Sequence, residues 1–329
     1  MTLPFAWPRA GLGLAWGGVA GSLLLAPLLA SAPAWVLVAP WALSAVALGL
    51  PHGAADPVVP FAMRGERLHI GPLAAFSVAY LGLGALVLLG WWLAPTAAAA
   101  GFIALTWAHW GQGDVYALRA LGWDVHLGGT AQRALAGVVR GALPMIVPLA
   151  AHSAVHAEVM GAMAAAFRPE SAEAVRQSVL AVPPSAVWGG LGAVAAGYAA
   201  WGAATARGRP GGWRTLGLDL AEVAGLGVFF AVLPPLWSVG VYFCLWHALR
   251  HLQRLGPLVA DGSARRLALV CTPATVGALA LIAAVFGAAL VSPVTGVGAY
   301  LVGIAALTVP HVALVAWMDV RQRVWTGPR

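Results

Sequence analysis

Two histidines in the segment YFCLWHALRHLQRL could hold a metal ion between them. His247 and His251 stand four residues apart, and residues with this spacing lie on one face of a helix, one turn apart. Two imidazoles placed in this way can bind one metal ion, as in other helical His-x-x-x-His sites. Hydrogen bonds from both rings to neighbouring helices are the alternative. The segment therefore predicts a candidate metal site, and the rest of the chain has to decide between the two roles.

Two further histidines are each followed by a carboxylate. His52 lies in GLPHGAADP and His109 in WAHWGQGD. If the backbone after His52 is helical, Asp56 lies one turn away and can hold the far ring nitrogen of a metal-bound imidazole; a loop turn capped by Asp56 is the alternative. Asp114 follows His109 within an apolar segment, where an unpaired carboxylate is costly. Both carboxylates are expected to support a site without binding the metal themselves.

The composition is that of a membrane protein. Of the 329 residues, 61% are hydrophobic and 9% are charged, and the mean hydropathy is +0.84, whereas soluble domains have about 25% charged residues. We therefore predict an all-α, polytopic transmembrane helical bundle that forms one integral membrane domain over residues 1–329. The net charge of +7 comes from arginines scattered over short loops, which argues against a nucleic-acid partner. The two cysteines, Cys244 and Cys271, offer no disulfide framework or CxxC zinc site.

The apolar segments predict about ten membrane spans, since a span requires about 20 predominantly apolar residues. Arginines gather in alternate loops, so the positive-inside rule predicts a protein of the cell membrane with both termini in the cytoplasm. Arg140 falls inside the fifth span and needs a partner that the sequence does not name. The expected spans are 11–31, 34–50, 70–93, 97–119, 131–151, 183–206, 215–233, 236–256, 267–291 and 294–318.

Five histidines fall at a similar expected depth. His311 lies in TVPHVALVAWMD and could instead bond a carbonyl group that Pro310 frees. The spans that carry His311 and the four histidines above all run from outside to inside, and each histidine lies in the middle or cytoplasmic half. This shared depth favours one common site. The remaining histidines fall in loops or at span ends, and no chemistry is assigned to them: His69, His126, His152 and His156.

Taken together, these motifs resemble those of a known family. PHGAADP, HWGQGD, WHALRH and the late PHV match, in order and spacing over nearly the whole chain, the Brp/Blh family of membrane β-carotene 15,15'-dioxygenases. The resemblance implies a non-haem iron enzyme, with an Fe(2+) cofactor, that splits β-carotene at its central double bond with O₂ to give two molecules of retinal. Trp110 stands where Phe is common, and Pro57 argues against a regular helix around Asp56. The implied iron ligands are His52, His109, His247 and His251.

The residue chemistry fits an iron site independently of the resemblance. Imidazole suits iron, and neutral donors that leave coordination positions open give room for O₂. Asp56 and Asp114 can offset the charge of a ferrous ion, and His311 is expected beside them. A carotenoid partitions into the bilayer, so a membrane-embedded site meets it directly. Aromatic residues near the histidines could line an apolar substrate tunnel, with simple packing as the alternative: Trp107, Trp110, Phe243, Trp246 and Trp317.

Three other classes of protein share some of these features. A membrane di-iron hydroxylase or desaturase also uses histidines near membrane helices, but it needs more of them, and this chain has no HH pair. A b-type haem protein pairs histidines on facing helices, and a transporter can use a His/Asp relay without a redox metal. For the dioxygenase, the expected partners are β-carotene and O₂ as substrates, membrane lipid, and a rhodopsin as a candidate recipient of retinal.

Overall fold

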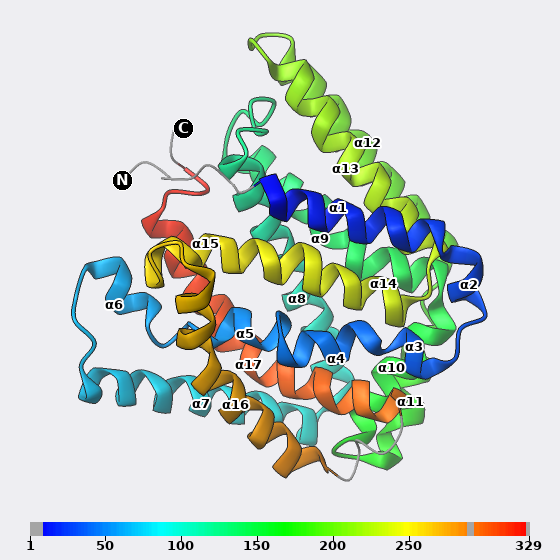
Figure 1. Ribbon diagram of the computed structural model, residues 1–329. Coiled ribbons are helices and arrows are strands. Elements are labelled where there is room, and N and C mark those ends of the chain that lie inside the picture. Colours follow the sequence, from blue (N-terminus) through cyan, green and yellow to red (C-terminus); the bar gives the residue numbers. More distant parts are fainter. Residues whose placement is uncertain (1–8, 288–292, 327–329) are drawn as a thin grey trace.

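The computed structural model describes residues 9–287 and 293–326, and in these residues the chain forms helices and no strand (Figure 1). This confirms the predicted all-α fold class. The elements are α1 (Arg9–Leu24), α2 (Ala26–Ala30), α3 (Ala34–Leu37), α4 (Ala39–Val46), α5 (Gly49–Ala54), α6 (Val59–Arg64), α7 (Ile70–Leu93), α8 (Pro95–Ala120), α9 (Thr130–Ala151), α10 (Ser153–Ala165), η1 (Pro169–Ser171), α11 (Ala172–Leu180), α12 (Pro184–Ala206), α13 (Gly212–Val232), α14 (Pro235–Val241), η2 (Tyr242–Ala248), α15 (Leu249–Val259), α16 (Ala264–Phe286) and α17 (Pro293–Arg321).

The number of spans is lower than the apolar segments predict. In the described residues, six helical segments are long and apolar enough to cross a membrane, or seven if α11 and α12, which meet at a 58° bend, form one span. Ten spans is therefore more than the structure supports, although a polytopic bundle is confirmed. The reason is that α1 is short, and that polar residues, histidines among them, lower the mean hydropathy of α8 and of the run from α14 to α15. The end of the expected span 267–291 lies outside the described residues.

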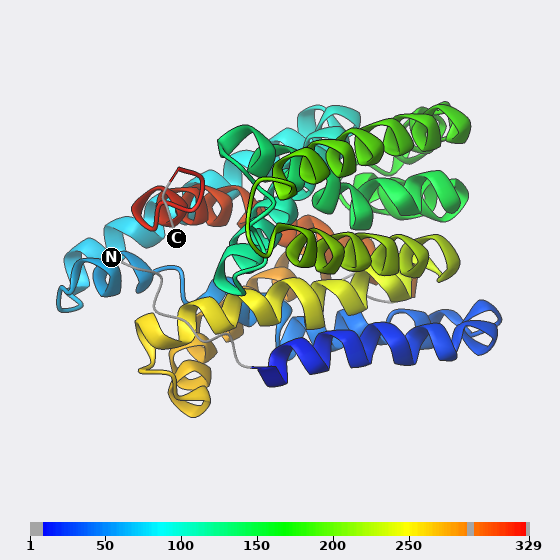
Figure 2. The same ribbon diagram turned by 90° about the horizontal axis from the view of Figure 1, so that it is seen from above.

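The long helices pack side by side. Figure 2 shows α1, α14 and α13 as neighbours with nearly parallel axes. The hairpin of α12 and α13 projects beyond the rest of the bundle at the top of Figure 1. Helix α17 lies in the interior beside α4 and α5, with α7 and α16 on its outer side. The bundle thus surrounds α17 and the run from α14 to α15 with other helices.

The run from α14 to α15 is the central element. Its middle part, Tyr242–Ala248, is π-helical, a local widening that occurs frequently at functional sites. Trp246 is fully buried, and Arg250 and Arg254 are almost fully buried. The sequence suggests that these two arginines mark the point where a membrane helix leaves the bilayer. They lie instead in the protein interior, and together with the two histidines of the run they make it less apolar than a candidate span.

The second apolar segment is broken rather than continuous. Residues 34–64 form four short helices, α3 to α6, and prolines such as Pro51 and Pro57 interrupt regular helical hydrogen bonding there. Broken membrane helices leave backbone carbonyl groups that side chains can bond. Nδ1 of His52, in α5, bonds the carbonyl oxygen of Gly49 in the same short helix.

Helices α8 and α9 approach closely because glycines face each other. A Cβ atom on Gly111 would overlap the carbonyl group of Gly137, and one on Gly141 would overlap that of Trp107. Residues 137–141 read GVVRG, and small residues four apart are a common means of close helix packing in lipid. This contact brings Arg140 of α9 within reach of the polar half of α8.

Candidate metal centre

Five histidines from separate parts of the chain meet inside the bundle. Neighbouring imidazole rings among them have centroids 4.9–5.6 Å apart, and all five side chains are buried. We call this group the histidine cluster. It unites the four histidines that the motifs imply as ligands with one that the sequence places only beside the site: His52 of α5, His109 of α8, His247 of η2, His251 of α15 and His311 of α17.

Most cluster histidines keep one ring nitrogen without a partner. Buried Nε2 atoms that bond no other group belong to His109, His247, His251 and His311. Since buried polar atoms in native proteins are nearly always paired, four such nitrogens in one place point to a group that binds them together. Candidate ligand atoms of His52, His109 and His247 lie within 4.8 Å of one another, as do those of His251, His311 and Asp56.

These separations suit a metal ion. With metal–nitrogen bonds of about 2.0–2.1 Å, two nitrogens on one ion can be up to about 4.2 Å apart. Within each of the two groups, the candidate ligand atoms therefore need to move only slightly to share an ion. Imidazole nitrogens are donors that suit iron as well as zinc, copper and nickel, so the donor set fits iron without selecting it.

Neighbouring groups orient three of the rings. Nδ1 of His311 lies 2.7 Å from Oδ2 of Asp56, and Nδ1 of His109 lies 3.3 Å from Oε1 of Gln112. Nδ1 of His52 bonds the backbone of its own short helix. A hydrogen bond that fixes the proton on Nδ1 leaves Nε2 as the metal-binding atom. In His109 and His311, the nitrogen without a partner is therefore Nε2, the atom that remains available to bind a metal ion.

Asp56 supports a different histidine from the one that its spacing suggests. Its carboxylate bonds His311 and accepts a second hydrogen bond from the Tyr80 hydroxyl at 2.9 Å. Helix α5 ends at Ala54, so the helical spacing that would direct Asp56 toward His52 is absent. The expectation of an Asp56–His52 pair is corrected to an Asp56–His311 pair.

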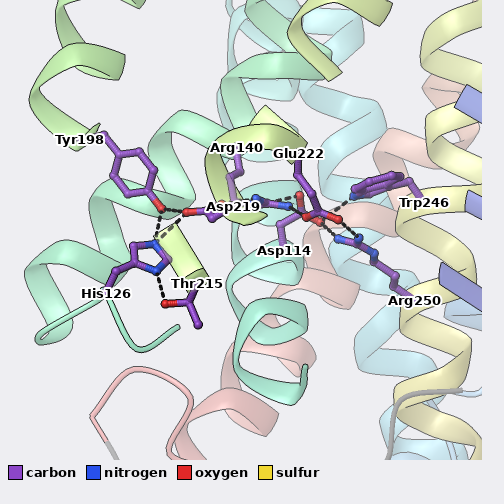
Figure 3. A network of polar contacts seen from close by, with 9 residues as sticks. All are labelled: Asp114, His126, Arg140, Tyr198, Thr215, Asp219, Glu222, Trp246 and Arg250. Atoms are coloured by element: carbon purple, nitrogen blue, oxygen red, sulfur yellow. Dashed lines mark hydrogen bonds and ion pairs between the residues drawn. The ribbon is translucent and has the colours of Figure 1, made fainter. Parts of the chain in front are cut away.

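Asp114 belongs to a second polar group, which we call the ionic network (Figure 3). Arg140 lies at its centre, 3.0 Å from Asp114 and 2.5 Å from Glu222, and it also pairs with Asp219. Arg250 bonds Asp114 at 2.9 Å and Glu222 at 3.2 Å. Arg140, which lacks a partner at the level of the sequence, thus has three carboxylates from two other helices.

Other residues extend the network at both ends. On one side of Figure 3, Asp219 accepts hydrogen bonds from Tyr198 and lies 2.9 Å from Nε2 of His126, whose Nδ1 lies 3.2 Å from Thr215. On the other side, the Trp246 indole donates to Asp114 at 3.1 Å. The oxygens of Asp114 therefore bond two arginines and a tryptophan, not a cluster histidine. Its predicted support of a metal-bound histidine stays a prediction.

The cluster and the ionic network are nevertheless close neighbours. A cavity of about 10 Å³, enough for about one water molecule, is lined by residues of both groups, among them Asp114, His109, His247 and Arg250. Arg254, three residues after His251, pairs with Asp319 at 2.7 Å. Asp319 also accepts a hydrogen bond at 2.9 Å from Gln112, the residue that orients His109.

An apolar cavity of about 420 Å³ begins at the cluster, with His52, His109, His247 and His311 in its wall. On α8 the lining residues run from Phe102 to Trp110, and on α17 from Val297 to His311. On both helices the histidine lies at or next to the last lining residue. The cluster therefore forms one end of the cavity, and the apolar wall extends toward the N-terminal ends of α8 and α17.

Comparison with known proteins decides the family. A family model described as Beta-carotene 15,15'-dioxygenase matches residues 43–319, a range that includes the whole histidine cluster. This chain belongs to that family. The probable beta-carotene 15,15'-dioxygenase Blh of Halobacterium salinarum is 38% identical over 329 residues, which cover 94% of this chain and 92% of the relative. The probable beta-carotene 15,15'-dioxygenase Brp of the same organism is 28% identical over 313 residues, which cover 87% and 84%. No solved structure matches the chain.

Two of the five aromatic residues suggested for a tunnel line the cavity of this dioxygenase-family protein. The Trp110 ring lies 5.5 Å from that of His247, and the Phe243 ring lies 5.6 Å from that of His52. Three others lie outside the cavity wall. Trp107 donates to the carbonyl oxygen of Val138, Trp246 belongs to the ionic network, and Trp317 packs against Arg321.

Several residues of the family member's site are not singled out by the sequence motifs. Asp219 and Glu222 stand three residues apart in an apolar segment, and buried charges at membrane depth are usually paired. They could therefore have been matched to Arg140. Asp319 near the end of the last apolar segment carries a similar signal. Tyr80, an ordinary tyrosine in an apolar helix, carries none.

Proposed function

We propose that this chain cleaves β-carotene at the central 15,15' double bond with O₂ and releases two molecules of retinal. The observation that carries the proposal is that the histidine cluster forms one end of an apolar cavity inside a helical bundle. Family membership supports it, because the relatives named above are probable beta-carotene 15,15'-dioxygenases. A di-iron hydroxylase and a transporter with a His/Asp relay remain the alternatives that the test below has to exclude.

The proposed cofactor is one ferrous ion. Its ligands would be drawn from the cluster through Nε2 atoms, with His52, His109, His247 and His251 as proposed ligands and His311 as a fifth candidate. When bound, iron would supply the redox chemistry that allows O₂ to react with an alkene. The neutral imidazoles leave the ion with its positive charge, and the Asp56 carboxylate, held 2.7 Å from His311, offsets part of it.

The cavity would position the substrate. Its wall is formed largely by apolar side chains, which suit a polyene and exclude water. Trp110 and Phe243 stand beside the cluster and would hold one double bond of the chain against it. The central bond is the proposed site of cleavage because the relatives are named as probable 15,15'-dioxygenases, and cleavage there gives two identical aldehydes.

The balance of atoms separates the proposal from its rivals. Each oxygen atom of O₂ enters one of the two aldehydes, so a dioxygenase needs no external electrons. A hydroxylase puts one oxygen atom into water and needs two electrons from a reductant for each turnover. A requirement for a reductant therefore distinguishes the two classes.

We also propose that the protein lies in the cell membrane with both termini in the cytoplasm, and that it passes retinal to a rhodopsin. The six candidate spans of the described residues, an even number, would put both termini on one face, and the arginines near both ends of the chain favour the cytoplasmic face. Reporter fusions at the two ends should both report the cytoplasmic side. Termini on opposite faces would contradict the orientation.

The function is tested with purified protein in detergent, supplied with Fe(II), β-carotene and O₂ and with no NADH or ferredoxin. We expect retinal as the sole aldehyde, with two molecules formed for each β-carotene consumed. Unequal apocarotenals would contradict central cleavage, and a strict requirement for a reductant would contradict the dioxygenase class. Intact β-carotene in the presence of bound iron would contradict the carotenoid-cleaving function.

A further inference from the structure

The apolar cavity contains a histidine that is remote from the cluster in the chain. His156 of α10 lines the cavity together with Val159 and Met160, which lie on the same helix face at positions i+3 and i+4. Its imidazole makes no hydrogen bond or ion pair with another described residue. His152, four residues earlier, is different, because its Nε2 lies 3.1 Å from the carbonyl oxygen of Ala231.

Helix α10 lies at the end of the cavity opposite to the cluster. Along α17 the wall runs from His311 to Val297, about 21 Å at 1.5 Å per residue. Gly298 packs directly against Ala162 of α10. His152, one turn before His156, contacts the end of α13, just before α14 begins. His156 therefore belongs to the far end of the cavity.

His156 places a polar ring in a largely apolar wall. The wall of the same cavity includes Met145, Met160, Leu236 and Val297, all buried and apolar. Burial lowers the pKa of the His156 imidazole to about 4, so the ring is neutral at physiological pH and offers one donor and one acceptor. An unpaired polar group in apolar surroundings is unfavourable, and a ligand with a hydroxyl or carbonyl oxygen would relieve this.

The two sides of the cavity differ. The part that ends at α10 is lined by the buried residues Met145, Met160 and Val297, and His156 and Val159 there are half-buried. The part between α7 and α16 reaches the surface of the bundle, where the lining residues Leu81 and Leu281 are 53% and 49% exposed. A carotenoid whose central bond lies at the cluster would extend one half toward α10 and the other half out through the opening between α7 and α16, so its two rings would lie in unlike surroundings.

We infer that His156 binds an oxygen substituent on one end ring of a carotenoid, so that hydroxylated carotenoids are ligands and substrates of this chain in addition to β-carotene. The inference rests on the proposed function, because it requires a carotenoid to extend from the cluster into the enclosed part of the cavity. A ring hydroxyl would donate to, or accept from, the neutral imidazole. A carotenoid with a hydroxyl on one ring would bind with that ring toward α10.

The test compares β-carotene with its derivative that carries one hydroxyl group on one ring. Binding to metal-free protein is measured by the change in carotenoid absorption, and cleavage by iron-loaded protein is measured as retinal and hydroxyretinal. In His156→Phe we expect the affinity for the hydroxylated carotenoid to fall about three- to tenfold, the range of one neutral hydrogen bond. The affinity for β-carotene should be unchanged or higher.

Two further variants separate hydrogen bonding from shape. His156→Gln keeps a donor and an acceptor and should restore most of the preference for the hydroxylated carotenoid. Val159→Leu alters the same wall without changing its polarity, and it should shift both affinities alike. Equal changes for both carotenoids in His156→Phe, or no change for either, would overturn the inference.

These outcomes do not depend on catalysis, because binding is measured without metal. A preserved binding preference with no retinal from either carotenoid would contradict the proposed function alone. Cleavage of β-carotene together with an unaltered hydroxyl preference in His156→Phe would contradict the inference alone.

Discussion

The histidine cluster and the ionic network lie side by side, but they differ in whether their buried polar atoms have partners. In the network, Arg140 directs its three guanidinium nitrogens to three carboxylates. In the cluster, four Nε2 atoms have no partner among the described residues. Both groups are buried by the same helices. Buried charges are tolerated when they are paired, whereas buried unpaired nitrogens call for a ligand. The difference fits a network that holds helices together and a cluster whose free nitrogens could bind the proposed metal ion.

The ionic network and the histidine cluster are also connected through one helical run. Arg250 and Arg254 each stand three residues after a cluster histidine, His247 and His251. Their ion pairs with Asp114, Glu222 and Asp319 fix the helix that carries both histidines. These ion pairs therefore position the histidine cluster. Variants in the ionic network and variants in the cluster should consequently have different effects.

The largest effect on activity is expected from a lost ligand. In His247→Ala, retinal formation should fall by more than about 100-fold, beyond the usual loss for a residue that only supports a ligand. Iron content, measured by elemental analysis, should fall with it, while the protein still inserts and its unfolding temperature changes little. His69→Ala, an exposed loop position, is the control. Full activity in His251→Ala would reject the proposed ligand set.

The largest effect on stability is expected from Arg140→Met. Removing one partner from a buried ion network leaves carboxylates unpaired, and we expect a loss of about 3–5 kcal/mol in the free energy of unfolding. Denaturant titration in mixed micelles measures it. Arg168→Met breaks an exposed pair with Glu170 and should cost at most about 1 kcal/mol. Iron loss in Arg140→Met without loss of stability would mean that the network acts on the metal site directly.

Two aspartate variants sharpen the contrast. Asp56→Asn should reduce iron affinity or activity about 10–100-fold without abolishing either, because Asn keeps the size and one acceptor for His311. Asp114→Asn should lower stability and affect iron affinity less than Asp56→Asn, since Asp114 bonds arginines. Metal titration and thermal unfolding of both proteins separate these effects. Complete loss of iron in Asp114→Asn would make Asp114 a ligand.

The smallest effect is expected at the cavity wall. Trp110→Phe keeps an aromatic ring beside the cluster, and the KM for β-carotene should change by less than about tenfold. Trp107→Phe, outside the wall, should leave KM unchanged. A larger change in Trp107→Phe than in Trp110→Phe would contradict the assignment of the cavity as the substrate site.

The sequence predicts the meeting of the histidines because their motifs fall in apolar segments, although the shared depth rests on ten spans, more than the described residues support. It overestimates the number of spans because some apolar segments are too short or too polar over a full 18-residue stretch, as in the run that carries His247 and Arg250. It pairs Asp56 with His52 because spacing assumes a regular helix, and α5 ends before Asp56. The contact of Asp56 with His311 joins residues 255 positions apart, which no local spacing reveals.

The most direct test of the central claim is the iron content of the purified protein after reconstitution with Fe(II), compared with that of the His247→Ala variant. If the cluster is one metal centre at the end of the substrate cavity, the protein should bind about one iron per chain and the variant far less. No bound iron in a folded protein, or the same iron content in both proteins, would contradict the account.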